Sequence, residues 1–576
     1  MEPNREARAY VTPLVVGVTG HRDLLVAEVD DLRQRITDLF VALHNRFPDI
    51  PLRLMTALAE GADRLAAHVA MSNGIDLQVV LPMPRQTYRD DFSTADSKAE
   101  FDALCEGAEV LELPNRHAAT QAIEAPGRDR DVAYANAGMF ISAHCHILLA
   151  IWDGLPSDNL GGTSQIIYFH HYDRLPGVAE SVPRTSLFLT DDESDLVYHI
   201  SCSRQSETGR APTMPPLQAC WFTTDPDMPR TKDMPGRYVR VFERSGEYNR
   251  DIRNFLESGR LFEFSESEPP ATACGAAARG IRNFFEIADV LANHFQLQVD
   301  RTLAAIYALA ILTGLMFILY SEWNPAGPLI FAFLSFLTIG VMIAGIARRR
   351  HWHRKHLDYR VLAEGLRVQY YRAIAGIHGE GHTKFAYDNF LRQRDMELGW
   401  IRNVMRVAGT VSDAQAAAPE QAGLAFAIRH WIGEAGQAGQ LQYYRQKASE
   451  RAHVNRVIDT VTHGCLAGGI VVAGVLAFFL NDITPGMQNS LIVLMGVLPL
   501  IAGVAEVYTQ RKADRELAKQ YHFMAQVFAN ARRRLDDAEN DTERREVLEG
   551  LGDAALSEHA EWILVRRERQ PEPGGF

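Results

Sequence analysis

Four runs of almost wholly apolar sequence dominate the second half of the chain. They cover residues 302–320, 328–347, 460–480 and 489–508. Each is close to the roughly 20 residues that a helix needs to cross a hydrocarbon core of about 30 Å. Short polar turns, SEWNPAGP and NDITPGMQ, join the runs in pairs. The pattern therefore predicts four transmembrane helices arranged as two hairpins.

The positions of lysine and arginine predict how these hairpins are oriented. Basic residues follow the second run, precede the third and follow the fourth, whereas neither turn contains a lysine or an arginine. Cytoplasmic flanks of membrane helices carry such an excess of cations, so we expect both turns outside and both termini in the cytoplasm. The flanking cations are Arg348, Arg349, Arg350, Arg354 and Lys355; Arg445, Lys447, Arg451 and Arg456; and Arg511, Lys512 and Arg515.

The first 175 residues have a different pattern, in which short apolar runs alternate with helical stretches. Strands are expected at 13–23 (running into a turn), 52–58, 77–81, 110–113 and 147–151, and helices at 24–46, 94–107, 129–144 and from Thr163 onward. This alternation predicts an α/β domain with a mostly parallel sheet and helices on both faces.

Ligands of such sheets bind outside the carboxyl ends of the strands, where the unusual residues of this sequence gather. Gly17 and Gly20 allow the backbone to approach a ligand closely, and the start of the next helix favours an anion. Arg22 is suited to a bidentate phosphate contact, although an ordinary strand-to-helix turn is the alternative. The candidate ligand-binding residues are Gly17, Gly20, His21, Arg22, Glu60, Gly61, Asp63, Arg64, Arg85, Tyr88, Asp153, Gly161, Gly162 and Thr163.

Composition narrows the functional classes. The 576 residues carry a formal net charge of −13, which argues against a nucleic-acid binder held by a basic surface. The six cysteines lie far apart, without the spacing of a zinc site, and are expected to be reduced thiols; no metal site or catalytic residue is assigned. The N-terminus lacks the pattern of a signal peptide, so residues 1 to about 300 are expected in the cytoplasm.

The remaining segments connect these parts. We expect a sensor domain over 1–205, an irregular insertion or linker over 206–279 and an all-α membrane region over 280–576. Within the last region, cytoplasmic helices are expected at 348–459 and 509–569. A helix over 280–301 leads directly into the first apolar run and is stiff enough to transmit a displacement.

Four segments of the first domain carry a specific resemblance. GVTGHRD, ALAEGADRL, LPMPRQTYRDDF and LLAIWDGLPSDNLGGTSQII resemble the SLOG superfamily, a Rossmann-like group related to DprA and LOG proteins. The resemblance implies a Rossmann-like fold with a pocket for a nucleotide or nucleotide-derived ligand and no other cofactor. It also implies that the Gly161–Gly162–Thr163 loop cradles phosphate and faces the turn at Gly20 and Arg22.

The sequence departs from the LOG enzymes at one position. Those enzymes resemble P-G-G-x-G-T-x-E, and Gln165 stands where the final glutamate would fall, while Leu160 replaces the proline. An amide cannot act as a general acid or base, which favours a sensor. The alternative is a membrane-anchored LOG-like nucleotide-processing enzyme, such as a phosphoribohydrolase, in which Glu60 or Asp63 does chemistry.

The membrane half has a resemblance of its own. HWHRKHLDYRVLAEGLRVQYYRAIAG, WIGEAGQAGQLQYYRQKA and EHAEWILVRRERQPEP resemble the SLATT family of membrane effectors, which accompany SLOG sensors and nucleotide-making cyclases in bacterial conflict systems. The resemblance implies a multi-pass protein of the bacterial inner membrane that forms or gates a pore, or disrupts the bilayer, in anti-phage defence. Its implied partners are a nucleotide second messenger, lipid and an operon-encoded nucleotide-producing enzyme.

Polar groups are sparse in the apolar runs. His463 and Glu506 lie near their cytoplasmic ends, and no row of charges of the kind found in transporters is present. Four spans are few for a pore within one chain, so we expect a homo-oligomer. Small residues at helix-packing spacing (Gly464 with Gly468, Ala304 with Ala308, Gly340 with Ala344) are expected to form close contacts.

Overall fold

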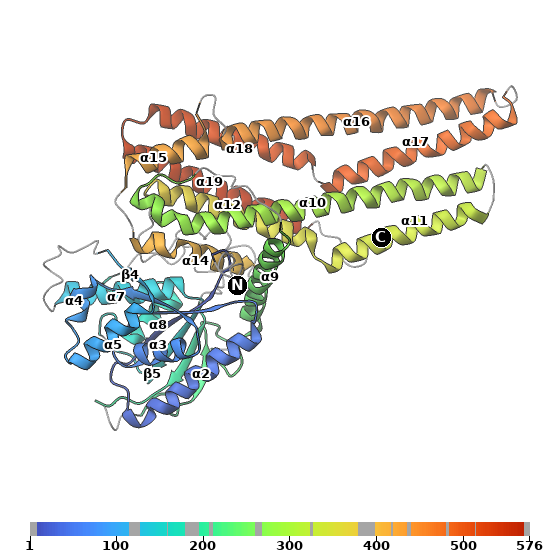
Figure 1. Cartoon of the computed structure of the whole chain (residues 1–576). Helices are drawn as coiled ribbons and strands as arrows, with labels where there is room; N and C mark the ends of the chain where they lie inside the picture. The colour runs from blue at the N-terminus through green and yellow to red at the C-terminus, as the bar shows by residue number, and fades with distance from the viewer. Residues whose placement is uncertain are drawn as a thin grey trace. The chain divides into compact units, whose positions relative to one another are not determined.

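The computed structural model of the chain describes residues 9–114, 127–157, 159–178, 195–206, 211–227, 229–259, 268–322, 327–377, 398–415, 419–434, 439–479, 483–512 and 514–568. Its elements form an N-terminal α/β domain with a mixed sheet and a large helical part that contains four long apolar helices (Figure 1). By packing, the chain divides into two compact units. The first consists of Met1–Ala288, Val361–Phe426 and Leu556–Phe576, and the second of Asp289–Arg360 and Ala427–Ala555.

The first unit is built on one sheet of the described strands. In chain order these are β1 (Leu14–Gly20), β2 (Leu52–Thr56), β3 (Asp76–Leu81), β4 (Glu109–Glu112), β5 (Ile147–Trp152), β6 (Val197–Ser201), β7 (Ala219–Phe222) and β8 (Arg230–Thr231). Their spatial order is β4-β3-β2-β1-β5-β6-β7-β8. The first six in that order are parallel, β7 is antiparallel to β6, and β8 is antiparallel to β7.

Helices cover both faces of this sheet. The connections contribute η1 (Val26–Glu28), α2 (Val29–Arg46), α3 (Ala62–Ser72), α4 (Arg85–Arg89), α5 (Ala95–Glu106), α7 (Arg128–His144) and α8 (Thr163–Tyr172). A Cβ on Gly17 would meet Ile141 and Cys145 of the α7 end, whereas a Cβ on Gly20 would meet Ala62 of α3. Residues an odd number apart on a strand face opposite ways, so α7 and α3 lie on opposite faces.

Two helices from outside the expected sensor segment also pack in the first unit. The stretch 206–279, expected to be irregular, contains β7, β8 and the whole of α9 (Gly236–Glu257). Asn249 of α9 accepts from Thr12 N–H (3.0 Å) and donates to Thr12 O (2.9 Å). From between the two hairpins, α14 (Gly399–Gln415) adds Ala414 to the buried cluster that contains Val15 and Phe140.

The expected element boundaries differ from the observed ones for local reasons. The helix expected from residue 24 begins as α2 at Val29, after the short turn η1. The strand expected to reach residue 58 ends at Thr56, because Leu58 turns to a φ of 56° and donates its N–H to Thr56 Oγ1 (3.0 Å). Within the stretch SESEPPATA at 265–273, which has the composition of a linker, the described residues 268–272 are in neither helix nor strand, and α10 begins at Ala273.

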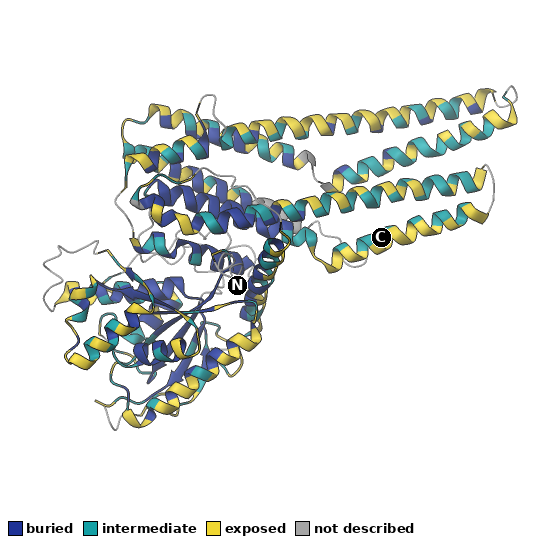
Figure 2. Ribbon diagram, in the orientation of Figure 1, coloured by how far each residue is buried: buried dark blue, intermediate teal, exposed yellow. Residues whose placement is uncertain are grey.

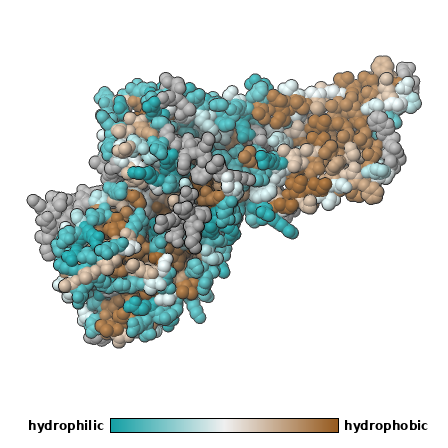
Figure 3. All heavy atoms as spheres, in the orientation of Figure 1, coloured by the Kyte–Doolittle hydropathy of each residue, from teal (hydrophilic) through white to brown (hydrophobic). Residues whose placement is uncertain are grey.

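The second unit contains the four apolar helices α10 (Ala273–Glu322), α11 (Gly327–Arg349), α16 (Gln440–Phe479) and α17 (Pro485–Lys512). Each is long and apolar enough to cross a membrane, and the most apolar stretches of α10 and α11 are 0% buried. Figure 2 shows these stretches as intermediate or exposed, with almost no buried residue, and Figure 3 shows the same region as brown, which marks it as hydrophobic. A monomer in water does not leave so large an apolar surface uncovered.

Glycines set the close contacts between these apolar helices. A Cβ on Gly314 of α10 would meet Leu500 of α17 at 2.5 Å, and one on Gly496 of α17 would meet Ile318 of α10 at 3.1 Å. The expected pairs contribute less. A Cβ on Gly464 would have no atom within 4 Å, and one on Gly340 would reach Leu309 only at 3.9 Å, but one on Gly468 would lie 3.3 Å from Leu498 of α17.

The other helices are α12 (Trp352–Ile374), α15 (Gln421–Ala427), the short π-helix η4 (Ile428–Ile432), α18 (Asp514–Asp537) and α19 (Asp541–Glu568). Trp431 of η4 is 1% exposed and packs edge-on against Phe528 of α18, with ring centroids 6.2 Å apart. Trp431 and Tyr444 are buried, and so is Trp400 in the first unit, whereas Tyr443 is half-buried.

Candidate functional site

The candidate site lies where the carboxyl ends of β1 and β5 meet. From β1 the chain builds outward through β2, β3 and β4, and it then returns to place β5 on the other side of β1. The connections after β1 and β5 therefore leave in opposite directions, and the region between them, called the crevice below, is the place at which such sheets bind ligands. The predicted residues at the ends of β1, β2, β3 and β5 all belong to this edge of the sheet.

The turn after β1 and the turn after β2 touch at two glycines. A Cβ on Gly20 would lie 2.4 Å from Ala62 Cβ and 2.7 Å from Ile151 O. Gly61 has a φ of 82°, and a Cβ there would lie 2.3 Å from Arg22 O. The backbone of His21 and Arg22 is therefore held against the start of α3, which requires glycine on both sides.

His21 and Asp153 connect the ends of β1 and β5. The backbone N–H of Asp153 donates to Nε2 of His21 (3.2 Å), and Oδ1 of Asp153 lies 3.3 Å from the same nitrogen. Burial lowers the pKa of His21, although Asp153 opposes that shift. The Asp153 carboxylate also accepts from Leu155 N–H (2.9 Å), so this pair shapes the turn after β5.

Asp63 is a buried acid in the first turn of α3. Its carboxylate accepts from the Thr56 hydroxyl (3.2 Å). Burial raises its pKa to about 6, and the hydrogen bonds from Thr56 and from the backbone of Ala59 and Ala57 oppose the shift without cancelling it. Through these contacts Asp63 stabilises the β2–α3 turn.

Glu60 and Arg64 link the same turn to α5. The Ser97 hydroxyl donates to Glu60, and Arg64 Nη1 donates to Ser97 O (3.0 Å), Ser97 Oγ (2.7 Å) and Glu100 (2.8 Å). Arg64 is buried and its guanidinium stacks over Phe92 at 4.3 Å. Both predicted residues are thus committed to internal contacts.

Arg85 and Tyr88 belong to the loop after β3. Arg85 pairs with Asp102 (3.2 Å), which also pairs with Arg89 (2.7 Å). Tyr88 is buried among Phe92, Phe101 and Tyr134, and burial raises the pKa of its hydroxyl. Because Arg85 already forms an ion pair with Asp102, it is a weaker candidate for a phosphate contact than Arg22.

The Gly161–Gly162–Thr163 loop opens α8, but its glycines serve the loop itself. Gly161 N–H donates to Gln165 Oε1 (3.1 Å), and Gly162 N–H donates to Asn159 O (2.9 Å). The next two N–H groups, of Thr163 and Ser164, have no acceptor among the described residues. They point outward at the positive end of a helix, where an anion is stabilised.

Arg22 is the exposed cation of the crevice. Its guanidinium stacks over Tyr134 of α7 at 5.3 Å, and no carboxylate of the described residues forms an ion pair with it. The residue after Tyr134 is Ala135, whose backbone nitrogen would lie 2.9 Å from a Cβ on Gly161. Tyr134 and Ala135 thus join the stacked arginine to the loop that begins α8.

No protein-family model matches this chain, and no curated protein matches it either. Within the residues that the structure describes, no cluster of three or more His, Cys, Asp or Glu side chains is arranged to hold a metal ion. The chemistry of the site therefore rests on its own geometry: an arginine without a carboxylate partner and the unoccupied N–H groups of a helix start. That combination suits a phosphate or another compact anion.

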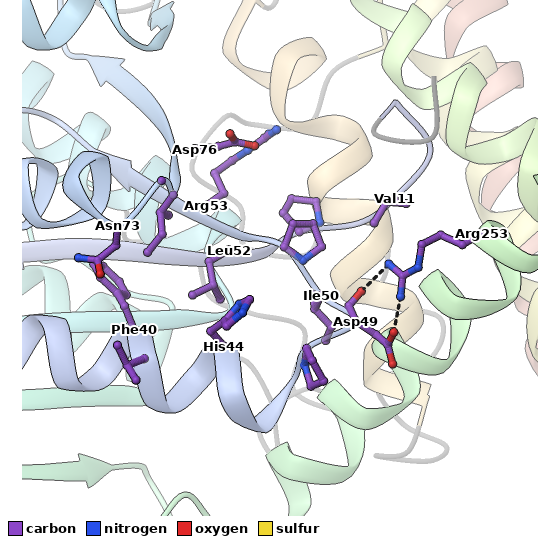
Figure 4. Close-up of a pocket in the computed structure, with 16 residues that line it drawn as sticks. Val11, Phe40, His44, Asp49, Ile50, Leu52, Arg53, Asn73, Asp76 and Arg253 are labelled. Carbon is purple, nitrogen blue, oxygen red and sulfur yellow. Dashed lines mark hydrogen bonds and ion pairs between the residues drawn. The ribbon is translucent and has the colours of Figure 1, made fainter. Parts of the chain in front are cut away.

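A second hollow lies at the opposite edge of the sheet. It has a volume of about 760 Å³ and is formed where β1, β2 and β3 begin (Figure 4). Arg253 and Asp49 pair at its rim through two dashed contacts in that view. None of the predicted binding residues lines it.

The contacts of two residues at the candidate site, Tyr134 and Gln165, were not predicted from the sequence. Tyr134 lies inside a helix and not at the end of a strand, and only the fold brings its ring beneath Arg22. Gln165 was identified as a departure from an enzyme motif, whereas its role here is to accept from Gly161 N–H. The helical spacing of Gly161 and Gln165 across the start of α8 was the available signal.

Proposed function

We propose that the protein is a membrane effector whose α/β unit senses a nucleotide-derived signal. The observation that carries the proposal is Arg22, a cation without a carboxylate partner that stacks on Tyr134, whose neighbour Ala135 packs against Gly161 before α8. A phosphate at this point would receive the guanidinium N–H groups and the N–H groups of Thr163 and Ser164. The strand order, which reverses at β1 and β5, supports a Rossmann-like nucleotide crevice.

The proposed output is the set of four apolar helices, inserted in the bacterial inner membrane with both termini cytoplasmic. Their exposed apolar surfaces and the basic residues that flank them support this orientation. Helix α10 supports coupling between the two units. The first segment of the first unit ends within this helix, at Ala288, and the helix continues from there without a break into an apolar run. A ligand that prefers one conformation of the crevice would shift the helix between two states.

The resemblance to SLOG and SLATT proteins extends the proposal to bacterial anti-phage defence. In this view an operon-encoded enzyme makes the nucleotide signal, and a homo-oligomer of the chain opens a pore or disrupts the bilayer. The position that a LOG-like enzyme needs as an acid is Gln165, whose amide oxygen accepts from Gly161 N–H. This is why sensing, rather than nucleotide processing, is proposed.

A binding screen on the full-length protein tests the sensor. Nucleoside mono-, di- and triphosphates, cyclic nucleotides and ADP-ribose derivatives are titrated calorimetrically into protein in phosphatidylcholine nanodiscs. At least one is expected to bind, and Arg22→Gln should weaken it about ten-fold or more. Arg33→Gln removes an exposed arginine of α2 and should leave binding unchanged. Equal affinity in the wild-type and Arg22→Gln proteins would refute the crevice as the site.

A further inference from the structure

The second unit has a hollow of its own, on helices that the sensor proposal does not use. It has a volume of about 860 Å³ and is formed by the end of η4, the beginning of α16 and the last turns of α18. Its lining mixes apolar groups with amides, three arginines and two carboxylates. The residues that the argument uses are Gly433, Arg445, Asn530, Arg532, Arg533 and Asp536.

Two of the three arginines are not neutralised. No carboxylate in the described part of the chain forms an ion pair with Arg445 or Arg533, and Arg533 donates instead to the amide oxygen of Asn530. Arg532 pairs with Asp536 (3.1 Å) and donates to Gly433 O (3.3 Å). The hollow thus has two arginines without an ion-pair partner, one on α16 and one on α18, and its three arginines outnumber its two carboxylates, those of Glu434 and Asp536.

The wall of this hollow at η4 has an unusual backbone. A π-helix ends at Gly433, whose φ is 101°, and a Cβ on Gly439 would lie 2.5 Å from Gly433 Cα. Behind this turn Trp431 is buried against Phe528. Single π-helical turns occur frequently at functional sites, and a backbone held in this way keeps its shape only where the surrounding packing enforces it.

We propose that this hollow binds a phosphate-bearing small molecule from the soluble phase. Two guanidinium groups on facing helices supply paired N–H donors of the kind that phosphate oxygens accept, and the amides add further donors. Given the proposed membrane insertion, a lipid headgroup cannot reach the site. At about 1.5 Å per residue, Arg445 precedes the apolar run that starts at Thr460 by about 22 Å along α16.

Such a ligand would act as a second input, separate from the Arg22 crevice. Arg445 lies on the same continuous helix as the third apolar run, and Arg533 lies on α18. A phosphate between them would favour the arrangement in which the two helices bring these arginines together. The ligand therefore biases the position of α16 to the extent that the alternatives separate them.

Pyrophosphate is the probe that tests the site. It is titrated calorimetrically into full-length Arg22→Gln protein in phosphatidylcholine nanodiscs, so that the sensor crevice does not contribute. We expect saturable binding that the double variant Arg445→Gln with Arg533→Gln weakens about ten-fold or more. The control double variant, Arg456→Gln with Arg534→Gln, removes two exposed arginines of the same helices that do not line the hollow. It should bind as the Arg22→Gln parent does.

Three results would overturn the proposal. They are a parent that does not bind pyrophosphate, an equal loss in both double variants, and a stabilisation by phosphatidylglycerol nanodiscs that only Arg445→Gln with Arg533→Gln removes. The last result would assign the arginines to lipid headgroups. Lysine at both positions keeps the charges and should retain part of the affinity, which separates lost binding from misfolding. Failure of this site leaves the Arg22 test unaffected, because the crevice variant is the common background.

Discussion

The guanidinium carbon of Arg22 lies 5.3 Å from the centroid of the Tyr134 ring. Stacking on a ring holds an arginine in place while it leaves the N–H groups at its edge available. No carboxylate in the described residues forms an ion pair with Arg22, so its charge is not neutralised by a direct partner there. Stacking on Tyr134 therefore holds the exposed Arg22 guanidinium in place while its N–H groups stay available to an anion.

Replacing the ring beneath Arg22 should weaken phosphate binding modestly. Tyr134→Leu removes the stacking partner, and we expect a loss of affinity of about three-fold to five-fold for a nucleotide that binds the crevice. Tyr134→Phe keeps the ring but removes the hydroxyl that donates to Asp91, and it should bind as the wild type does. Calorimetry on both variants checks this. Equal losses in the two would mean that the Asp91 contact matters and the ring does not.

Gly61 should be far less tolerant of alanine than Gly74. Both have a positive φ, of 82° and 67°, but a Cβ on Gly61 would collide with Arg22 O whereas one on Gly74 meets nothing within 4 Å. We expect Gly74→Ala to cost about 1 kcal/mol and Gly61→Ala about 3 kcal/mol or more, because it adds a clash to the backbone strain. Thermal unfolding in detergent measures both, and similar shifts would contradict the close contact of the two turns.

Asp63 should make stability fall as pH rises from about 4 to about 7. Burial raises its pKa to about 6 from 3.8, so the folded state holds a proton that the unfolded state has released. This contribution is fully present below about pH 4 and is lost as pH rises through 6. Over that range it amounts to about 3 kcal/mol.

The matching variant is Asp63→Asn, which has no charge to titrate. The wild-type free energy of unfolding, measured relative to Asp63→Asn, should decline between pH 4 and pH 7, whatever the absolute cost of the amide. Denaturant unfolding at a series of pH values gives this difference. A flat or rising difference would show that Asp63 is ionised in the folded protein throughout that range.

Helix α14 should be indispensable to the α/β unit although it lies far along the chain. Ala414 is 1% exposed within the core cluster of the sheet, and its neighbour Gln415 is exposed. Ala414→Asp buries a charge and should destabilise the unit by about 3 kcal/mol or more, whereas Gln415→Asp should be nearly neutral. Limited proteolysis of the full-length protein compares them. Equal resistance would exclude α14 from that core.

The sequence predicted the elements whose signals are local. Apolar runs bounded by glycine turns identified β1, β2, β3 and β5, and run length alone identified the four apolar helices. The helix α9 was hidden by the surrounding Pro, Thr and Asp, although Tyr238, Val241, Phe242 and Ser245 recur on one buried helical face. Proline and glycine at its start, Pro235 and Gly236, are more typical of a loop than of a helix.

The non-local parts of the fold and site had no such signal. Joining α14 to the sheet requires contacts such as that of His146 Nε2 with Asn403 O (3.3 Å), which no linear division of the chain reveals. At the candidate site, the sequence placed most of the candidate residues at one sheet edge but could not rank them. Only the contacts separate Arg22 from Arg85, which Asp102 occupies, and from Arg64, which Ser97 and Glu100 occupy.

Ion leakage from liposomes reconstituted with the full-length protein tests the central proposal most directly. A nucleotide that binds the crevice is added to vesicles that contain wild-type, Arg22→Gln or Arg33→Gln protein. The account predicts leakage from the wild-type and Arg33→Gln vesicles at ligand concentrations near the binding constant, and much less from Arg22→Gln. A nucleotide that binds through Arg22 yet leaves all three sets of vesicles sealed would contradict it.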